Sequence, residues 1–367
     1  MKRIMFIDYL RSLAITLVLI EHYFGIFWFY HDSIAKDALF LPIKNLNFKS
    51  PLEFLLINQI NLGYIGVGLF FLISGFVVFK SIEKRTAKQY LTRRFIRIYP
   101  TYFFVMIITL CFLFLSAHLN GIKFPFTWKN IIINFLLLQD WFYVQLIEQA
   151  NWYLQVIIKF YFLIGLVLIF FKKRILEDDK SILKFGIFLF LFHLLTNFLL
   201  KKTVYKIYYG IIFTFAYSSW YLIFILLGIC LYNFYHNKWT KTIFLYNFLL
   251  ILLLFIVSGL IGPVFDLTKP VIIGFIFSLI IFIIFLILES KFTYSKTINF
   301  ISRISYSIYL IHRINGYILL NFFIKLNIKP ILAITFVTAI VVILSYVIDL
   351  FIRRLLLSLK VSLKSLG

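Results

Sequence analysis

Residues 8–22 read DYLRSLAITLVLIEH, an apolar stretch that predicts the first membrane-spanning helix and yet contains four ionisable side chains. Ionisable groups inside a bilayer cost free energy, so each of them is a candidate functional residue. Arg11 and His22 are eleven residues apart, about three helical turns, so both project from one face of the helix. Their axial separation is roughly 16 Å. They cannot touch on a straight helix, but they can contact two ends of one long substrate.

The composition predicts a membrane protein. The chain has 63% hydrophobic and only 14% charged residues, far from the balance of soluble domains. Apolar runs recur from end to end, so we interpret residues 1–355 as one transmembrane domain and 356–367 as a short basic cytoplasmic tail. The first apolar run is long and charged and lacks a small-residue cleavage site, so we expect no cleavable signal.

The net charge of +23 does not indicate a nucleic-acid partner. The basic residues lie in short loops between apolar runs, which is the pattern that sets membrane orientation. Cys111 and Cys230 both lie inside apolar runs. We therefore expect no disulfide and no metal site, and the lipid bilayer is the first predicted partner.

Ten apolar runs have the length needed to cross a bilayer. They are residues 7–30, 60–80, 99–117, 152–171, 183–200, 211–234, 242–261, 270–289, 302–322 and 330–352. Another run, 129–142, is shorter and contains Asp140, and we interpret it as re-entrant or interfacial. The predicted fold is an all-α, polytopic helical bundle of about ten transmembrane helices.

The distribution of basic residues predicts the orientation. With ten spans both termini lie on one side, and that side receives 23 of the 37 Lys and Arg residues, against 11 on the other. The richer side is predicted to be cytoplasmic. If residues 129–142 spanned fully, the later loops would exchange sides and this asymmetry would weaken.

Glycines mark the second span, in which residues 63–76 read GYIGVGLFFLISGF. Such glycines are also found in phosphate-binding loops, but no strand–turn–helix pattern surrounds these. Small residues in a membrane helix more often allow neighbouring helices to approach closely. We therefore favour a packing role.

The most basic loop ends in an arginine cluster, Arg93, Arg94 and Arg97, just before Pro100. In a helix all three side chains can converge, because they are three or four residues apart. One interpretation is a positive anchor at the lipid headgroups. The other is an anion site, because arginine binds phosphate through two parallel hydrogen bonds.

Two later spans carry polar stripes. The fourth span begins with Trp152, and Gln155 lies four residues before Lys159 on one helix face. The ninth span has Tyr309 and His312 at helical spacing. Hydrogen bonding between helices would explain this stripe, and so would the wall of a cavity opposite His22.

The remaining histidines, His31, His118, His193 and His236, are interpreted as structural or solvated. Asp349 and Arg353 are four residues apart at the end of the last span and predict a local ion pair.

Several of these stretches resemble the acyltransferase 3 family of bacterial integral membrane O-acyltransferases. Arg11 and His22 match the first-helix motif, and residues 66–76 resemble the second helix. Arg94 and Arg97 resemble the cytoplasmic arginine motif, and SYSIYLIH at 305–312 resembles the late-helix signature. In order and spacing these matches cover most of the chain.

The chain departs from the family at one motif. The fourth span of the family often has a glutamate, whereas Ile157 and Ile158 stand here, with Gln155 and Lys159 as the nearest polar groups. Any role of that glutamate is in doubt here. We also expect no extracytoplasmic hydrolase-like domain after the last span.

The resemblance implies a multi-pass protein of the bacterial inner membrane that transfers an acyl group, such as acetyl, from cytoplasmic acyl-coenzyme A to a sugar hydroxyl. No bound cofactor is implied; acyl-coenzyme A is a co-substrate, and the acceptor is a carbohydrate or glycolipid. A hydroxyl needs a base to attack a thioester, and histidine titrates near neutral pH, so we expect His22 to be that base. Glu21, the adjacent residue, points elsewhere.

The predicted substrate contacts follow the shape of coenzyme A. Arg93, Arg94 and Arg97 are expected to bind its phosphates, and Arg11 its middle or a phosphate. The cavity that leads to His22 is expected to be lined by four residues, Tyr309, His312, Gln155 and Trp152.

Two other classes of protein stay open. A polysaccharide exporter can have the same membrane architecture, although exporters often have internal repeats and none is clear here. An assembly partner embedded in the lipid is the other alternative, and only the spacing of Arg11 and His22 argues against it. Consumption of a donor thioester separates an enzyme from both. The sequence names neither the acceptor glycan, the acyl chain nor the oligomeric state.

Overall fold

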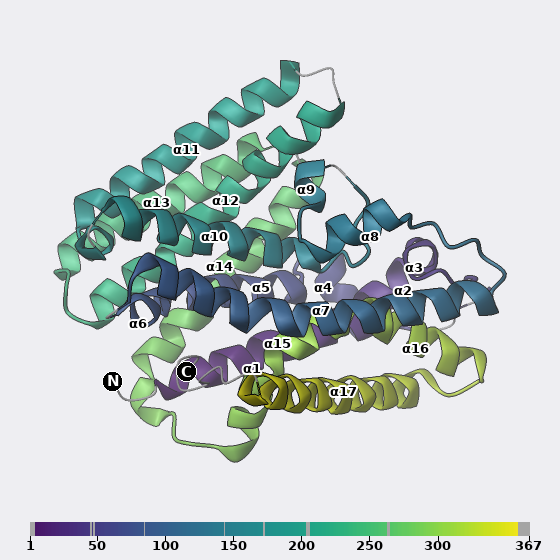
Figure 1. The fold of residues 1–367 in the computed structure, drawn as a ribbon. Helices are drawn as coiled ribbons and strands as arrows, with labels where there is room; N and C mark the ends of the chain where they lie inside the picture. The colour runs from purple at the N-terminus through teal and green to yellow at the C-terminus, as the bar shows by residue number, and fades with distance from the viewer. Residues whose placement is uncertain are drawn as a thin grey trace.

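The computed structural model describes residues 4–358 except 45, 47, 84, 143, 172, 203–205 and 263–264. Within that part of the chain the fold is all-α, with no strands, and eight helices are long and apolar enough to cross a membrane (Figure 1). This confirms an all-α polytopic membrane protein. Most of the predicted 356–367 tail lies outside the described residues, since helix α17 ends at Ser358.

The helices before the fourth predicted span are α1 (Met5–Ile20), η1 (Glu21–Ile26), α2 (Phe27–Phe29), α3 (His31–Ala38), α4 (Glu53–Ile57), α5 (Leu62–Phe76), α6 (Val78–Ile82), α7 (Ala87–Leu119), α8 (Trp128–Phe135) and α9 (Gln139–Phe142). The later helices are α10 (Asn151–Phe170), η2 (Lys173–Leu176), α11 (Asp179–Lys202), α12 (Lys206–Tyr235), α13 (Lys241–Ile261), α14 (Phe265–Ile287), η3 (Glu289–Lys291), α15 (Lys296–Ile311), α16 (Ile314–Lys325) and α17 (Pro330–Ser358).

Eight of the ten predicted spans correspond to the eight long apolar helices. The other two are interrupted. The expected span 60–80 is the 15-residue helix α5 followed by α6, and the expected span 302–322 is divided into α15 and α16 at His312 and Arg313. The beginning of α1 and the end of α17 lie at the same end of the bundle (Figure 1). That arrangement agrees with an even number of crossings.

Helix α5 lies in the middle of the bundle, where it packs against α1, α12 and α14. Its glycines make this possible. A Cβ atom at Gly66 would lie 2.5 Å from the carbonyl oxygen of Ala14, and one at Gly75 would lie 2.2 Å from that of Ile225. Only glycine allows such close approach of two helix backbones. The packing role predicted for these glycines is confirmed.

An aromatic core fills the space between α5, α12 and α14. Phe71 stacks on Tyr221 with ring centroids 5.5 Å apart, and Phe224 lies 4.6 Å from Phe275. On one side of this core α11, α12 and α13 pack together, and on the other side lie α1, α15, α16 and α17 (Figure 1). Helix α5 therefore joins two groups of helices.

Residues 129–142 form two short helices, α8 and α9, and neither is long enough to span a bilayer. Asp140 of α9 lies 3.0 Å from Nζ of Lys159, near the middle of α10. A segment that contacts the middle of an apolar helix without crossing the bundle agrees with the re-entrant interpretation.

Candidate active site

Four chain interruptions meet within the bundle. The first helix changes from α-helical to π-helical geometry at Glu21, helix α5 begins at Leu62, helix α10 begins at Asn151, and the late span breaks at His312 and Arg313. Side-chain contacts connect the π-helical turn to the start of α5 and to the late break, and the helix before that break to the start of α10. Interrupted helices place backbone and side-chain polar groups at membrane depth, which is tolerated only where they line a cavity or satisfy one another.

Glu21 explains the junction of the first helix with α5. Its carboxylate accepts hydrogen bonds from the side chain of Asn61 and the backbone N–H of Leu62, both at 3.0 Å. Both donors belong to the start of α5, whose first N–H groups have no partner within the helix. Glu21 thus faces α5 and not the site of its neighbour His22, as the sequence predicts.

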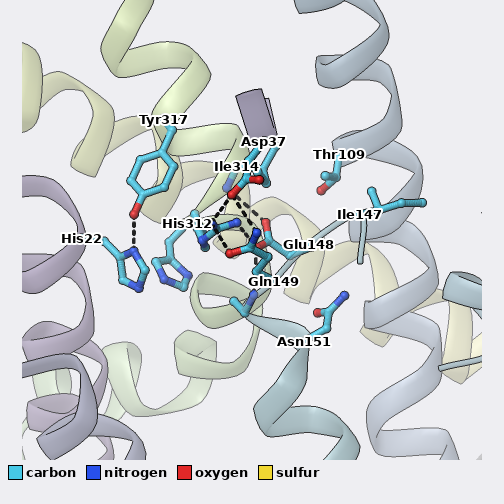
Figure 2. A network of polar contacts seen from close by, with 12 residues as sticks. His22, Asp37, Thr109, Ile147, Glu148, Gln149, Asn151, His312, Ile314 and Tyr317 are labelled. Carbon is cyan, nitrogen blue, oxygen red and sulfur yellow. Dashed lines mark hydrogen bonds and ion pairs between the residues drawn. The ribbon is translucent and has the colours of Figure 1, made fainter. Parts of the chain in front are cut away.

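His22 lies in the π-helical turn η1 and is partly exposed. Its Nδ1 is 2.5 Å from the hydroxyl oxygen of Tyr317 on α16, and its ring lies 4.6 Å from that of His312 in an edge-to-face arrangement (Figure 2). Its Nε2 has no hydrogen-bond partner among the described residues. Single π-helical turns occur mostly at functional sites.

His312 is fully buried beside His22. Its Nδ1 is 2.8 Å from the carbonyl oxygen of Tyr309, and because a carbonyl only accepts, Nδ1 carries the proton. Its Nε2 is then unprotonated, and this atom has no hydrogen-bond partner among the described residues. The ninth predicted span therefore brings His312 to His22, as expected for a wall opposite that residue.

The other three predicted lining residues are placed differently. The Tyr309 hydroxyl donates to the carbonyl oxygen of Ala150 at 2.9 Å, which connects α15 to the start of α10. Gln155 is buried and its Nε2 has no described partner. Trp152 points toward the aromatic core, with its ring 5.1 Å from that of Tyr221. Of the four, only His312 contacts His22.

An ionic network with a buried centre lies beside the two histidines (Figure 2). Arg313 donates to Asp37 of α3 at 2.8 Å and to Gln149 at 2.8 Å, and its other terminal nitrogen is 3.5 Å from Glu148. Gln149 in turn donates to Asp37 at 2.8 Å. The network joins α3, the loop before α10, and the break between α15 and α16.

Glu148 is only 1% exposed and receives donors alone. Besides Arg313 these are the backbone N–H groups of Ala150 at 3.0 Å and Ile314 at 3.1 Å. Burial raises the pKa of Glu148, and the charge of Arg313 together with these two backbone donors opposes the rise. Partners that only donate suit the carboxylate form.

The arginines of α1 and α7 form a second cluster. Arg11 is 3.7 Å from Asp8, one turn earlier on α1, and interacts electrostatically with Arg97 of α7. Both arginines also interact with the same two tyrosines, Tyr153 and Tyr161. Arg97 is exposed and has no ion pair among the described residues. Two neighbouring guanidinium groups repel each other, so an anion bound between Arg11 and Arg97 would be favourable, and the pair is a candidate anion site.

The three arginines of α7 do not act alike. Arg94 is buried, with its guanidinium 4.4 Å from the ring centroid of Tyr161 and 5.3 Å from that of Tyr90. Arg93 is only partly buried and interacts with Arg85 in the preceding loop. Arg97 alone meets Arg11. Of the three arginines that were predicted to converge, only Arg97 lies near Arg11, and Arg94 packs against tyrosine rings instead.

Lys159 has its polar partners within the protein. Its Nζ donates to Asp140 at 3.0 Å and to Ser218 of α12 at 2.8 Å. The ion pair fixes α9 against α10 and gives this buried amine a charged partner. Among the described residues no group of three or more His, Cys, Asp or Glu side chains is placed to hold a metal.

The fold and the site define a polytopic membrane protein that holds a histidine pair inside the bundle and an arginine pair nearer one end of it. The family model described as an acyltransferase domain matches residues 4–350. The chain belongs to the acyltransferase 3 family, and it is accordingly a membrane acyltransferase. Comparison with curated proteins gave no significant match, and comparison with solved structures gave none.

Glu148, Arg313, Asp37 and Tyr317 were not predicted as site residues. The one available signal was Arg313, an arginine inside a predicted span, since such a charge needs a buried partner. Its partners lie 165 and 276 residues away along the chain. No local pattern connects positions that far apart, so only the fold could identify them.

Proposed function

We propose that this acyltransferase moves an acyl group, acetyl in the simplest case, from cytoplasmic acyl-coenzyme A to a hydroxyl of a cell-surface or lipid-linked carbohydrate. The observation that carries the proposal is the first helix. It presents an anion-binding arginine, Arg11, and a partly exposed histidine, His22, on one face. Their axial separation of roughly 16 Å suits a donor whose phosphates and thioester lie at opposite ends.

The arginine cluster is suited to the phosphates of the donor. Arg97 is exposed and lies near Arg11, and Tyr153 and Tyr161 accompany both. Guanidinium groups bind phosphate oxygens with paired hydrogen bonds, and tyrosines add donors and flat rings. Arg94, whose guanidinium lies near the rings of both Tyr90 and Tyr161, supports this surface and does not itself offer a free guanidinium.

His22 is suited to act as the base. The acceptor O–H attacks the thioester carbonyl carbon while Nε2 of His22 takes its proton. A carbon–oxygen bond forms, the carbon–sulfur bond breaks, and the departing coenzyme A thiolate recovers the proton from His22. The products are the O-acyl ester and free coenzyme A. Positioned general bases of this kind contribute about 10²–10⁴-fold to rate.

The proposed class of acceptor rests on the family resemblance and on the predicted orientation of the protein in the membrane. With the arginine cluster toward the cytoplasm, as the charge distribution predicts, the opposite end of the site opens toward the outside, where surface glycans are. We accordingly propose the bacterial inner membrane as the location.

The test is acetyl-coenzyme A binding by the detergent-purified protein, compared with Arg11→Ala and Arg97→Ala. Arg354→Ala, which removes an exposed arginine at the end of α17, is the matched control. Saturable binding that is weakened by about tenfold or more in the first two variants and kept in the control supports the donor site. A folded wild-type protein that neither binds nor consumes the thioester would point to the exporter alternative.

A further inference from the structure

The network of Glu148, Arg313, Asp37 and Gln149, in which Glu148 and Arg313 are buried, has no part in the chemistry proposed above. Arg313 is 9% exposed and Glu148 1%, so both charges are taken almost wholly out of solvent. Burying an ion pair seldom increases stability compared with an apolar pair of the same size. A costly feature beside the proposed base needs another explanation.

The network ends at His22 through a short chain of contacts. Glu148 contacts Arg313 and accepts from the backbone N–H of Ile314, the first residue of α16. The carbonyl of Arg313 accepts from the backbone N–H of Tyr317 at 2.8 Å, and the guanidinium lies 5.6 Å from the Tyr317 ring. The hydroxyl of Tyr317 meets Nδ1 of His22 at 2.5 Å.

Each contact restricts the next one. The first N–H of α16 has no acceptor within its own helix, and Glu148 supplies one with the charge that a helix N-terminus favours. This fixes the beginning of α16 at the break. Asp37 and Gln149 hold the other side of Arg313, so the break is tied to α3 and to the loop before α10. Tyr317 lies one turn into α16, so fixing the beginning of the helix also fixes the position of Tyr317.

We propose that Glu148, Arg313 and Tyr317 are positioning residues that fix the ring orientation and tautomer of His22 for its role as base. The inference rests on the proposed function. The Tyr317 hydroxyl can either donate to or accept from Nδ1, and the proposal takes the tautomer in which Nδ1–H donates and the hydroxyl oxygen accepts. The lone pair is then on Nε2, the nitrogen without a described partner. Fixing one tautomer by a hydrogen bond to the other ring nitrogen is a general way to prepare a histidine for proton transfer.

The experiment measures steady-state acyl transfer by the full-length protein for Glu148→Gln, Tyr317→Phe and the double variant. Tyr317→Phe removes one oxygen and keeps the ring. We expect kcat to fall by about 100-fold in each single variant, because small displacements of a reacting group have effects of that size. We expect KM for acetyl-coenzyme A and its binding to stay unchanged, because Arg11 and Arg97 are untouched.

The double variant tests whether the residues act in one chain. If Glu148 acts through Tyr317, the double variant is no slower than Tyr317→Phe alone. Independent losses that multiply would overturn the proposal, as would a wild-type kcat in Tyr317→Phe. If Glu148→Gln does not fold, Gln149→Ala takes its place in the cycle, because it removes the contacts of Gln149 with Arg313 and Asp37 and leaves the Glu148 carboxylate in place.

Asp349→Asn is the matched control. Asp349 also bridges two arginines, Arg303 at 3.3 Å and Arg353 at 2.9 Å, and Arg303 lies on α15. Asp349 itself lies on α17 and contacts the middle of α15, more than two helical turns before the break at His312, so this substitution is expected to leave kcat unchanged. An equal loss in this control would mean that any disturbed ion pair lowers activity, and positioning would be rejected. A wild-type protein with no transfer at all would instead refute the proposed function.

Discussion

His193 and His312 are both fully buried in this bundle, and their surroundings differ in one respect. Each ring nitrogen of His193 has partners: Nδ1 lies 2.9 Å from the carbonyl oxygen of Ala216, and Nε2 lies 2.8 Å from that of Ser258. His312 has a partner on Nδ1 only, and its neighbour His22 has Nε2 without one. The satisfied ring of His193 is typical of a structural histidine, whereas the Nε2 atoms of His312 and His22 are free of described partners where the two rings meet.

The same difference separates the two groups of helices. Around His193, helices α11, α12 and α13 are held together by fixed hydrogen bonds. Around His22 and His312 the helices are interrupted, and their polar ends are held by side chains from distant segments. We expect substitutions in the first region to affect stability and substitutions in the second to affect the rate of transfer.

The largest effect is expected for His22→Ala. Loss of the proposed base should lower acyl transfer by about 10³-fold while the protein remains folded and abundant. Transfer assays on detergent-purified protein, normalised to monodisperse material, measure this. Normal acyl transfer by this variant would show that His22 is not the base, and that it does not differ in role from the structural histidine His193.

A smaller effect is expected for His312→Asn. The amide nitrogen of asparagine can still donate to the Tyr309 carbonyl, so the substitution removes chiefly the Nε2 half of the ring. We expect kcat to fall by about 10-fold, because the surface against which His22 packs is lost. The thermal midpoint should change little. If kcat were unchanged while the midpoint fell, His312 would be a structural histidine like His193.

His193→Ala should act on stability alone. It removes the ring that contacts the carbonyl groups of Ala216 and Ser258 and the side chain of Asn197, and a buried polar group left unsatisfied costs about 1–3 kcal/mol. We expect a lower thermal midpoint with kcat per folded molecule unchanged. A fall in kcat without a change in the midpoint would contradict the division between the two regions.

The smallest effect concerns Asp178, at the exposed start of α11. It accepts from the backbone N–H of Ser181 at 2.8 Å, and the Ser181 hydroxyl and this N–H lower the pKa of Asp178. A lowered pKa in the folded protein means that the contribution to stability is present above the ordinary aspartate pKa and is lost as the pH falls through the lowered value. At neutral pH, Asp178→Ala should therefore lower the thermal midpoint, by less than His193→Ala does. In acid, Asp178→Ala and the wild-type protein should have the same midpoint.

Much of the fold could be predicted from the sequence. Eight of ten spans were found from apolar length, since the bilayer sets that length, and the glycines of α5 indicated close packing. The ion pair of Asp349 with Arg353 was predicted because i and i+4 residues on one helix are neighbours. The two interrupted spans were counted as ordinary ones, because apolar content does not record where a helix breaks.

The sequence by itself determined the membrane class, the number of apolar segments and the placement of Arg11 and His22 on one face, because these depend on local composition and on the helical repeat. Only the tertiary structure decided which polar groups meet. Glu148 pairs with Arg313, 165 residues later in the chain, and His22 contacts Tyr317, 295 residues later, and His312. Such pairs follow from how the helices pack, since a buried charge or donor specifies that it needs a partner and not which residue provides it.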